Sequence, residues 1–310
     1  MKIEFTKMHG CGNDYVYING FTQRIEQEKK KDFVIRVSDR HFGIGSDGVI
    51  FINPSEIADF EMEMYNADGS RAEMCGNGIR CVAKYVYDHG MTDKNDITIE
   101  SFGKIKPIKI EAVNGSAELI RVDMGEPELR AGYIPVKYGA LDSISSEDAE
   151  SRIVSGTATE QERRDGKITT HIIDKPITSN GVEYRITCVS MGNPHAVIFM
   201  DPDGLDIEAV GPGLENHPFF PNRANIEFVR IDNRSNVHMR VWERGTGETL
   251  ACGTGCCATA VACVLNGYTD RMVTVHVLGG DIIVEWSEED NHVYMTGPAT
   301  TVYEGILKYE

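Results

Sequence analysis

Two cysteines stand in the same local setting at two places in the chain. Cys75 precedes Gly76-Asn77-Gly78, and Cys252, 177 residues later, precedes Gly253-Thr254-Gly255; a helical pattern follows each. The first N–H groups of a helix lack intrahelical partners, and the helix dipole favours negative charge there. We therefore expect each thiol to have a lowered pKa, and the same N–H groups to be able to hold a carboxylate.

Two such thiols facing one α-carbon from opposite sides suit inversion of its configuration. One cysteine, as a thiolate, removes the proton from one face, and the other, as a thiol, returns a proton to the opposite face. Neither thiol alone suffices, and a disulfide between them would block the reaction. We interpret the remaining six cysteines as packing residues: Cys11, Cys81, Cys188, Cys256, Cys257 and Cys263.

Other chemistry is less well supported. No CxxC pair is present, so the spacing does not predict a structural zinc site or any other metal site. A thiol metal-binding or redox-sensing protein built on Cys252, Cys256 and Cys257 is the non-enzyme alternative, and it predicts metal uptake or a functional disulfide. Residues 43–48 match GxGxxG, but a strand pattern follows them instead of a helix, which argues against a dinucleotide site.

Composition limits the class of protein. The 310 residues carry a net charge of −17, with 25% charged and 41% hydrophobic residues, as in a soluble globular protein of about two domains. The acidic excess disfavours nucleic acid and anionic membranes as partners. Residues 249–269 are uncharged but are interrupted by glycines, so we expect a buried helix there and not a membrane span. No targeting segment is visible at the N-terminus, and a cytoplasmic location is expected.

The chain repeats itself. Segments 60–65 and 237–242 match at the same offset of 177, Gly12-Asn13 matches Gly192-Asn193 at 180, and segments 49–52 and 228–231 match at 179. Small insertions would produce such a drift, so the sequence predicts two copies of one domain. The expected halves are 1–128 with a C-terminal strand at 298–310, and 129–297. Residues 140–180 have no counterpart and are interpreted as an insert of low functional weight.

Each half is predicted to be sheet-dominated. Alternating segments predict strands at 3–8, 14–18, 49–52, 60–65, 97–101 and 104–113, and at 185–190, 196–200, 225–231, 237–242, 273–277 and 281–286. Outer helices are expected near 25–39 and 206–216, and a helix that is apolar on several faces follows each cysteine. The fold class is therefore α+β, with two pseudo-symmetric halves, each a mostly antiparallel barrel-like sheet around a central helix, and an active site in the cleft between them.

Seven long motifs, in order along both halves, carry a family resemblance. They are residues 8–14 (MHGCGND), 66–70 (NADGS), 73–81 (EMCGNGIRC), 190–195 (SMGNPH), 222–225 (NRAN), 243–249 (ERGTGET) and 251–255 (ACGTG). Together they closely resemble the diaminopimelate epimerase family. The resemblance implies an isomerase that interconverts LL- and meso-2,6-diaminopimelate, a step of lysine and peptidoglycan precursor synthesis, without pyridoxal phosphate or any other cofactor. It also implies a cytoplasmic homodimer.

The resemblance also assigns roles to residues of this chain. Cys75 and Cys252 become the catalytic pair, and Gly76-Asn77 with Gly253-Thr254 hold the reacting carboxylate. His195 and Glu243 flank the reacting amino group and help to polarise the cysteines. The remaining expected substrate contacts are Asn13, Asn66, Asn193, Asn225 and Arg244, with Glu243 also in contact with substrate.

The residue chemistry agrees with those roles. Diaminopimelate carries two ammonium and two carboxylate groups; asparagine amides can both donate and accept, and Arg244 can take a carboxylate bidentately. A proline or hydroxyproline racemase is the nearest alternative, but a monocarboxylate lacks the distal end that these groups would bind. Two positions depart from the family: Cys11, where a small or aliphatic residue is commoner, and Gly48, where some members place a glutamine that reaches the substrate.

Overall fold

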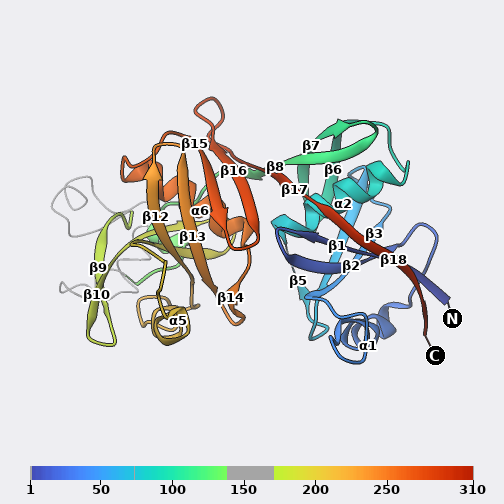
Figure 1. The fold of residues 1–310 in the computed structure, drawn as a ribbon, viewed down its shortest axis with the longest axis horizontal. Helices are drawn as coiled ribbons and strands as arrows, with labels where there is room; N and C mark the ends of the chain where they lie inside the picture. The colour runs from blue at the N-terminus through green and yellow to red at the C-terminus, as the bar shows by residue number, and fades with distance from the viewer. Residues whose placement is uncertain (1, 73, 138–170, 310) are drawn as a thin grey trace. The chain divides into compact units, whose positions relative to one another are not determined.

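The structure, a computed structural model, describes residues 2–72, 74–137 and 171–309. Contacts divide the chain into two compact units: unit 1 contains Met1–Met124, Gly279–Ile282 and Tyr294–Glu310, and unit 2 contains Gly125–Leu278 and Ile283–Val293. Figure 1 labels the elements of both units. In each unit a sheet of mixed strand directions surrounds one buried helix, which confirms the predicted α+β fold class.

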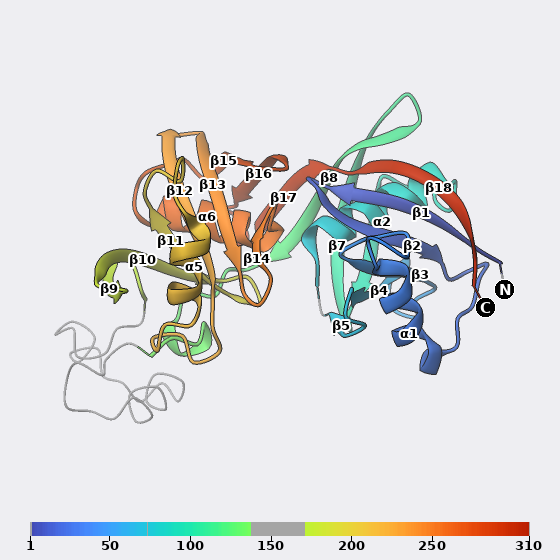
Figure 2. The same ribbon diagram turned by 60° about the horizontal axis from the view of Figure 1, so that its bottom comes forward.

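Unit 1 is organised around α2 (Gly76–Asp88), with α1 (Gln27–Ser38) on its outside. Its strands are β1 (Lys2–Gly10), β2 (Asn13–Asn19), β3 (Gly48–Asn53), β4 (Phe60–Asn66), β5 (Arg71–Ala72), β6 (Asp96–Ser101), β7 (Lys104–Val113), β8 (Ser116–Gly125), β17 (Val293–Pro298) and β18 (Thr300–Lys308). Strand β1 pairs antiparallel with β2 and with β18, so the last strand of the chain lies beside the first (Figure 2).

Unit 2 is organised around α6 (Gly253–Leu265), with α5 (Ile207–Glu215) outside and a 3-10 turn at Ala131–Tyr133. Its strands are β9 (Lys175–Ser179), β10 (Val182–Ser190), β11 (Pro194–Phe199), β12 (Asn225–Asn233), β13 (Asn236–Glu243), β14 (Gly247–Thr249), β15 (Met272–Val277) and the end of β16 (Gly280–Trp286). All predicted strands and all four predicted helices are present.

The two units pair their strands in the same pattern. An antiparallel pair, β1–β2 or β10–β11, leads into a parallel pair, β2–β3 or β11–β12. An antiparallel pair follows, β3–β4 or β12–β13, and then a parallel pair, β4–β6 or β13–β15. The parallel ladders begin at Tyr15 opposite Gly48 and at His195 opposite Asn225. This shared topology supports the internal repeat.

The central helices are buried nearly all round because strands contact them on several sides. In α2 every residue from Gly76 to Val86 is buried, and in α6 nearly every residue from Gly253 to Cys263 is buried. Helix α2 contacts β1, β2, β6 and β7, and helix α6 contacts β10, β11, β12 and β15. Such enclosure holds the N-terminus of each helix, where the cysteine stands, in a fixed place.

Part of the segment interpreted as an insert belongs to the core of unit 2. Most of it, residues 140–170, lies outside the described residues. Strand β9, however, pairs antiparallel with β10, and Ile172 and Ile177 are buried in the hydrophobic cluster of this unit. Residues 171–179 of the segment interpreted as an insert or connector are therefore integrated into the sheet and core of unit 2. The low functional weight of the segment stays a prediction.

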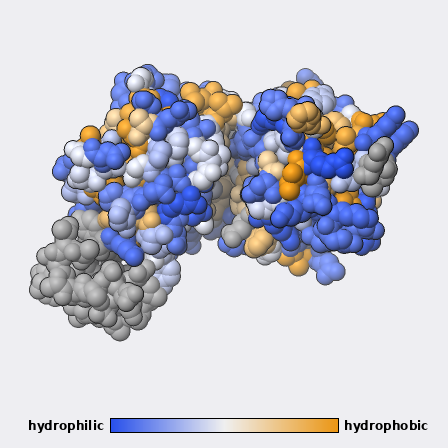
Figure 3. Space-filling view, turned by 90° about the horizontal axis from the view of Figure 1, so that it is seen from below, coloured by the Kyte–Doolittle hydropathy of each residue, from blue (hydrophilic) through white to orange (hydrophobic). Residues whose placement is uncertain are grey.

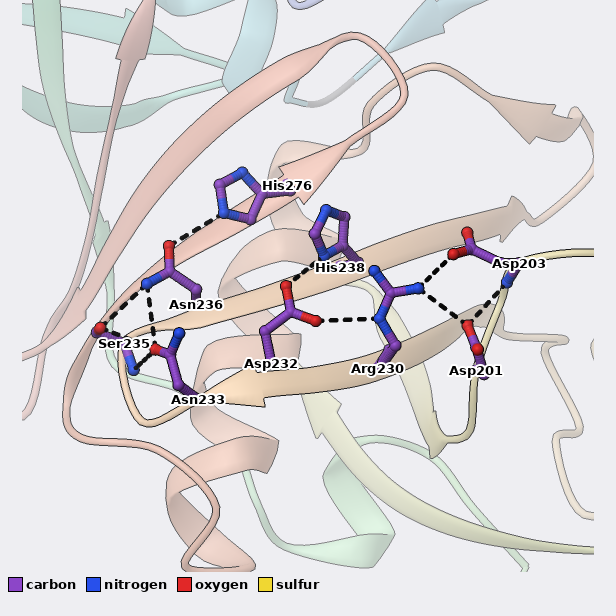
Figure 4. Close-up of polar contacts among 9 residues, drawn as sticks. All are labelled: Asp201, Asp203, Arg230, Asp232, Asn233, Ser235, Asn236, His238 and His276. Carbon is purple, nitrogen blue, oxygen red and sulfur yellow. Dashed lines mark hydrogen bonds and ion pairs between the residues drawn. The ribbon is translucent and has the colours of Figure 1, made fainter.

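The surface of unit 2 carries an extended polar network across β12 and β13. Arg230 contacts Asp201 at 3.1 Å, Asp232 at 3.0 Å and Asp203, and Asp232 contacts His238 Nδ1 at 2.6 Å (Figure 4). Arg230 and its partners are partly or fully exposed, so each pair adds little stability. More broadly, the face seen in Figure 3 is largely hydrophilic. No helix in the described part of the chain is long and apolar enough to cross a membrane.

Two phenylalanines test the placement of the core. Phe228 in β12 is 0% exposed, whereas Phe42 is 95% exposed. Phe228→Ala leaves a cavity and should lower the free energy of unfolding by about 3–5 kcal/mol. Phe42→Ala should change it by about 0.5 kcal/mol or less. Denaturant titration followed by circular dichroism measures both, and equal effects of the two substitutions would contradict the assigned core.

Candidate active site

Cys75 caps the N-terminus of α2. Its Sγ accepts a hydrogen bond from the N–H of Gly78 at 3.2 Å and donates one to Asn13 Oδ1 at 3.2 Å. The side chain is half-buried. A Cβ built at Gly78 would lie 3.5 Å from this sulfur and only 2.7 Å from Ile50 Cδ1. Glycine at this position therefore lets the Ile50 side chain of β3 pack against the first turn of α2, while the distance to the sulfur is an ordinary contact.

Asp47 fixes the direction in which Asn13 presents its amide. Asn13 Nδ2 donates to Asp47 Oδ2 at 2.7 Å, so the amide oxygen is the edge turned toward Cys75. The Arg40 guanidinium bonds Asp47 at 2.8 Å and Asp14 at 2.7 Å, and Lys7 also pairs with Asp14. These ion pairs are linked to Asn13 through Asp47. The sequence motifs did not identify Asp47, although it immediately precedes Gly48, one of the two positions that depart from the family.

Arg80 anchors the first turn of α2, directly after Cys75. It is 0% exposed, and its guanidinium donates to Gly76 O at 3.2 Å, Asn77 Oδ1 at 3.0 Å and Pro298 O at 3.2 Å. Asn77 in turn donates to Asn13 Oδ1 at 3.4 Å. The predicted residues Asn13, Cys75, Gly76 and Asn77 are thus brought together, and Arg80 was missed although it lies inside the motif 73–81.

Asn66 ends β4, as Glu243 ends β13 in the other unit. Its Nδ2 donates to Ser70 Oγ at 3.1 Å, and its backbone N–H donates to Ser70 O at 2.9 Å, which closes a tight turn. The predicted contact of Asn66 with substrate stays a prediction.

Cys252 caps α6 in the corresponding position of unit 2. It is 6% exposed, and its Sγ lies 3.5 Å from Thr254 Oγ1. Burial and the nearby carboxyls of Glu243 and Glu227 raise the pKa of Cys252 well above its ordinary value, although Thr254 and the N–H of Gly255 oppose the change. The prediction of a lowered pKa is therefore wrong for Cys252, because desolvation and two acidic neighbours outweigh the helix N-terminus.

Glu243 is the acidic residue beside Cys252 that sequence reasoning expected. Its Oε1 accepts a hydrogen bond from Thr249 Oγ1 at 2.6 Å, and burial raises the pKa of its carboxyl. The Cys252 side chain also bonds Glu243 and favours the ionised carboxyl. Thr249, within the motif 243–249, was not singled out, but it holds the carboxyl of Glu243 in place.

His195 and Asn193 join the start of α6 through a chain of hydrogen bonds. His195 Nε2 lies 3.0 Å from Asn193 Oδ1, and Asn193 Nδ2 donates to Thr254 Oγ1 at 3.3 Å. The other ring nitrogen, Nδ1, lies 2.6 Å from Glu227 Oε1. Glu227 was missed, since its strand pattern in residues 225–231 reads as an ordinary alternation of apolar and polar positions.

Asn225 and Arg244 form a second link at the end of β13. Asn225 Oδ1 accepts from the Arg244 N–H at 2.9 Å, and its Nδ2 donates to Pro194 O at 3.0 Å. Arg244 is exposed, with Nη1 donating to Asn222 O at 3.1 Å. Its guanidinium can therefore reach a carboxylate in solution, while the backbone around it is held by Asn225.

In the described part of the chain, no three His, Cys, Asp or Glu side chains are grouped so as to hold a metal ion. The alternative that relied on Cys252, Cys256 and Cys257 has no geometric support there, since Cys256 and Cys257 are 0% exposed within α6.

Two units of matching topology, each with a cysteine at the N-terminus of its enclosed helix, define the fold class. Solved structures with that fold include a phenazine biosynthesis protein of the PhzF family from Bacillus anthracis, at a TM-score of 0.64 and 17% identity over 100% of both chains. A hydroxyproline epimerase from Agrobacterium vitis matches at a TM-score of 0.63 and 14% identity over 99% of this chain and 91% of its own. At those identities the likeness concerns the fold alone.

Sequence comparison is more specific. The diaminopimelate epimerase family model matches residues 5–130 and 187–302. Curated diaminopimelate epimerases from Agathobacter rectalis and Methanococcus maripaludis are 52% and 50% identical, each over 98% of this chain and 99% of the relative. The chain belongs to the diaminopimelate epimerase family and is an isomerase.

The raised pKa of Cys252 gives a direct prediction. A raised pKa keeps this thiol protonated to higher pH, and only the thiolate is alkylated readily. In the folded protein, alkylation of Cys252 by iodoacetamide should reach half its maximal rate well above the ordinary cysteine value of about 8.5. Peptide mass spectrometry over a pH series measures this rate. The same cysteine in concentrated guanidinium chloride is the control, and a folded-state midpoint at or below that of the unfolded chain would contradict the assignment.

Proposed function

We propose that this isomerase interconverts LL- and meso-2,6-diaminopimelate by a two-thiol, two-base reaction without a cofactor. The observation that carries the proposal is the recurrence of a cysteine-capped, enclosed helix at matching points of two units in a chain of this family. The names of the relatives support the substrate, and the matched spacing of Cys75 and Cys252 supports the mechanism.

In the proposed step, the thiolate of one cysteine takes the α-proton and leaves an electron pair on the α-carbon. The thiol of the other cysteine then gives its proton to the opposite face, so the product is the opposite configuration at that carbon. The two sulfurs exchange protonation states in each turnover, and the reverse reaction begins with the other base. No external oxidant, reductant or carrier is needed for this proton balance.

The helix N-termini supply the electrostatic stabilisation. We propose that the N–H groups around Gly76-Asn77 and Gly253-Thr254 bind the carboxylate next to the reacting carbon, where negative charge increases as the proton leaves. The remaining proposed substrate contacts are the side chains of Asn13, Asn66, Asn193, Asn225, Glu243 and Arg244. His195 and Glu243 support the cysteine of unit 2.

Arg244 favours diaminopimelate over a cyclic amino acid. Its guanidinium is exposed while its backbone is held by Asn225 Oδ1 at 2.9 Å, an arrangement that suits a carboxylate at the far end of a long substrate. Proline and hydroxyproline lack that second carboxylate. The protein is further proposed to act in lysine and peptidoglycan precursor synthesis, in the cytoplasm and as a homodimer, with halves at 1–128 plus 298–310 and 129–297.

Hydrogen exchange tests the proposal. Purified protein incubated with LL-diaminopimelate in D₂O, under reducing conditions and without added cofactor, should place deuterium at the α-position while the meso isomer forms. Cys75→Ala and Cys252→Ala should each lower the rate of epimerisation by about 100- to 10,000-fold, because one proton transfer loses its acid or base. Proton NMR of the α-position measures both events.

Cys263→Ala is the matched control, because Cys263 is also a buried cysteine of α6 but lies at the far end of the helix from Cys252. It should keep the wild-type rate in the folded fraction. Full epimerisation by Cys75→Ala, or no α-deuteration by the wild-type protein, would overturn the mechanism. Deuteration of proline in place of diaminopimelate would contradict the proposed substrate and support a proline racemase instead.

A further inference from the structure

We propose that Glu227 is a positioning residue of this isomerase, which holds the His195 ring so that the Asn193 amide is presented correctly at the start of α6. The inference rests on the proposed function and extends it to a residue that neither the sequence motifs nor the family resemblance singled out. It depends on four linked contacts in unit 2 and on a comparison with the matching place in unit 1.

The Glu227–His195 pair is completely enclosed. Both side chains are 0% exposed, and Glu227 Oε1 lies 2.6 Å from His195 Nδ1. From the other ring nitrogen the chain continues through Asn193 to Thr254 Oγ1, which lies 3.5 Å from Cys252 Sγ. A buried carboxyl is thereby connected to the catalytic thiol through a sequence of short polar contacts.

The chain of contacts determines where the protons lie. Asn193 Oδ1 can only accept, so the His195 Nε2 at 3.0 Å must carry a hydrogen. The 2.6 Å contact on the other side then needs a second proton between Nδ1 and Glu227. The pair holds both protons either as imidazolium and carboxylate or as imidazole and carboxylic acid, and each form is neutral overall. Glu227 thus fixes the Nε2–H form of the ring, as a carboxylate partner does for histidine elsewhere.

Loss of Glu227 would release that constraint. A neutral imidazole can place its single hydrogen on Nδ1. His195 Nε2 and Asn193 Oδ1 would then face each other as two hydrogen-bond acceptors with no hydrogen between them. The amide would then turn its NH₂ group toward the ring and its oxygen toward Thr254. Asn193 would present the wrong edge at the carboxylate-binding end of α6, and small errors of orientation there are costly to the reaction rate.

Packing alone does not explain Glu227. Among the described residues its Oε2 has no hydrogen-bond partner, although the residue is fully buried, and burial raises the pKa of its carboxyl while His195 opposes the shift. An unpartnered buried oxygen costs free energy that an apolar side chain of similar size would not. Because Glu227 lowers the stability of the fold in this way and lies near Cys252, we infer that it contributes to the reaction.

In unit 1 the position that corresponds to Glu227 is occupied by the apolar residue Ile50. Ile50 is the third residue of β3 and Glu227 the third residue of β12, and the two parallel ladders begin at Tyr15 and at His195. A Cβ built at Gly78 would lie 2.7 Å from Ile50 Cδ1, and one built at Gly255 would lie 2.9 Å from Glu227 Oε1. The fold therefore accepts Tyr and Ile where unit 2 has His195 and Glu227.

Three variants separate positioning from packing. E227I removes the carboxyl and should lower kcat about 10- to 100-fold. E227Q can still donate an amide hydrogen to His195 Nδ1 and should retain more activity than E227I. The double variant H195Y/E227I copies the pair of unit 1, and it should match the wild-type melting temperature more closely than E227I while its kcat stays low.

E63Q is the matched control, because Glu63 is a buried glutamate that bonds Lys30, Asn53 and Tyr65 and none of the proposed site residues. It should leave kcat near the wild-type value.

Nitrogen NMR of histidine-labelled protein tests the inference without relying on activity. His195 signals, assigned by their absence in H195Q, should show a hydrogen on Nε2 in the wild type and its loss or partial loss in E227I. If E227I fails to fold, E227Q and the wild-type spectrum still decide the question.

Four results would overturn the inference: an unprotonated Nε2 in the wild type, wild-type kcat in E227I, E227Q no more active than a folded E227I, or recovery of both stability and kcat in H195Y/E227I. A wild-type protein that does not deuterate diaminopimelate would refute the proposed function instead, and the spectra would still report on Glu227 and His195.

Discussion

A sulfur atom placed at the buried start of a helix is the constraint around which both units are organised. Three residues after each cysteine, a glycine lets the neighbouring strand approach the first turn of the helix closely. A Cβ would lie 2.7 Å from Ile50 Cδ1 at Gly78 and 2.9 Å from Glu227 Oε1 at Gly255. The helix behind each cysteine must also be held rigidly, which explains why strands enclose α2 and α6 on several sides. The burial of nearly every residue in the first three turns of these helices follows from that enclosure.

The two helix starts have different electrostatic surroundings although their backbones correspond. Cys75 is half-buried and contacts the Asn13 amide and the Gly78 N–H, and Asn13 in turn bonds Asp47, which pairs with Arg40. Cys252 is buried next to Glu243 and Glu227, and burial with those carboxyls raises its pKa. Duplication of a domain therefore supplied the positions, while individual substitutions, such as glutamate at 227 where the first unit has Ile50, made the two thiols chemically unequal.

Much of this structure could be read from the sequence because the decisive patterns are local. Alternation gave the strands, and the cysteine–glycine loops located the enclosed helices. Longer-range features could not be read in the same way. Strand β9 lies at the edge of a segment without a counterpart, and its pairing with β10 was not predicted, whereas a C-terminal strand was expected at 298–310 and corresponds to β18. Arg80, Asp47 and Glu227 act on other side chains and not through a motif of their own, so only three-dimensional contacts identify them. The lowered pKa expected for Cys252 failed for a similar reason, since burial and neighbouring carboxyls cannot be judged from the residues next to it in sequence.

The pairing of the last strand with the first affects how the chain can fold during synthesis. Strand β18 pairs with β1 over most of its length, from Lys308 opposite Lys2 to Thr300 opposite His9 (Figure 2). One side of β1 therefore stays unpaired until β18 has left the ribosome. Strands β9 to β15 and helix α6 of unit 2 are all made before that moment, so the half translated later can complete its core sooner. The exposed edge of β1 is meanwhile a site at which a nascent chain could pair with the wrong strand, and the ordering of the two halves along the chain sets how long that exposure lasts.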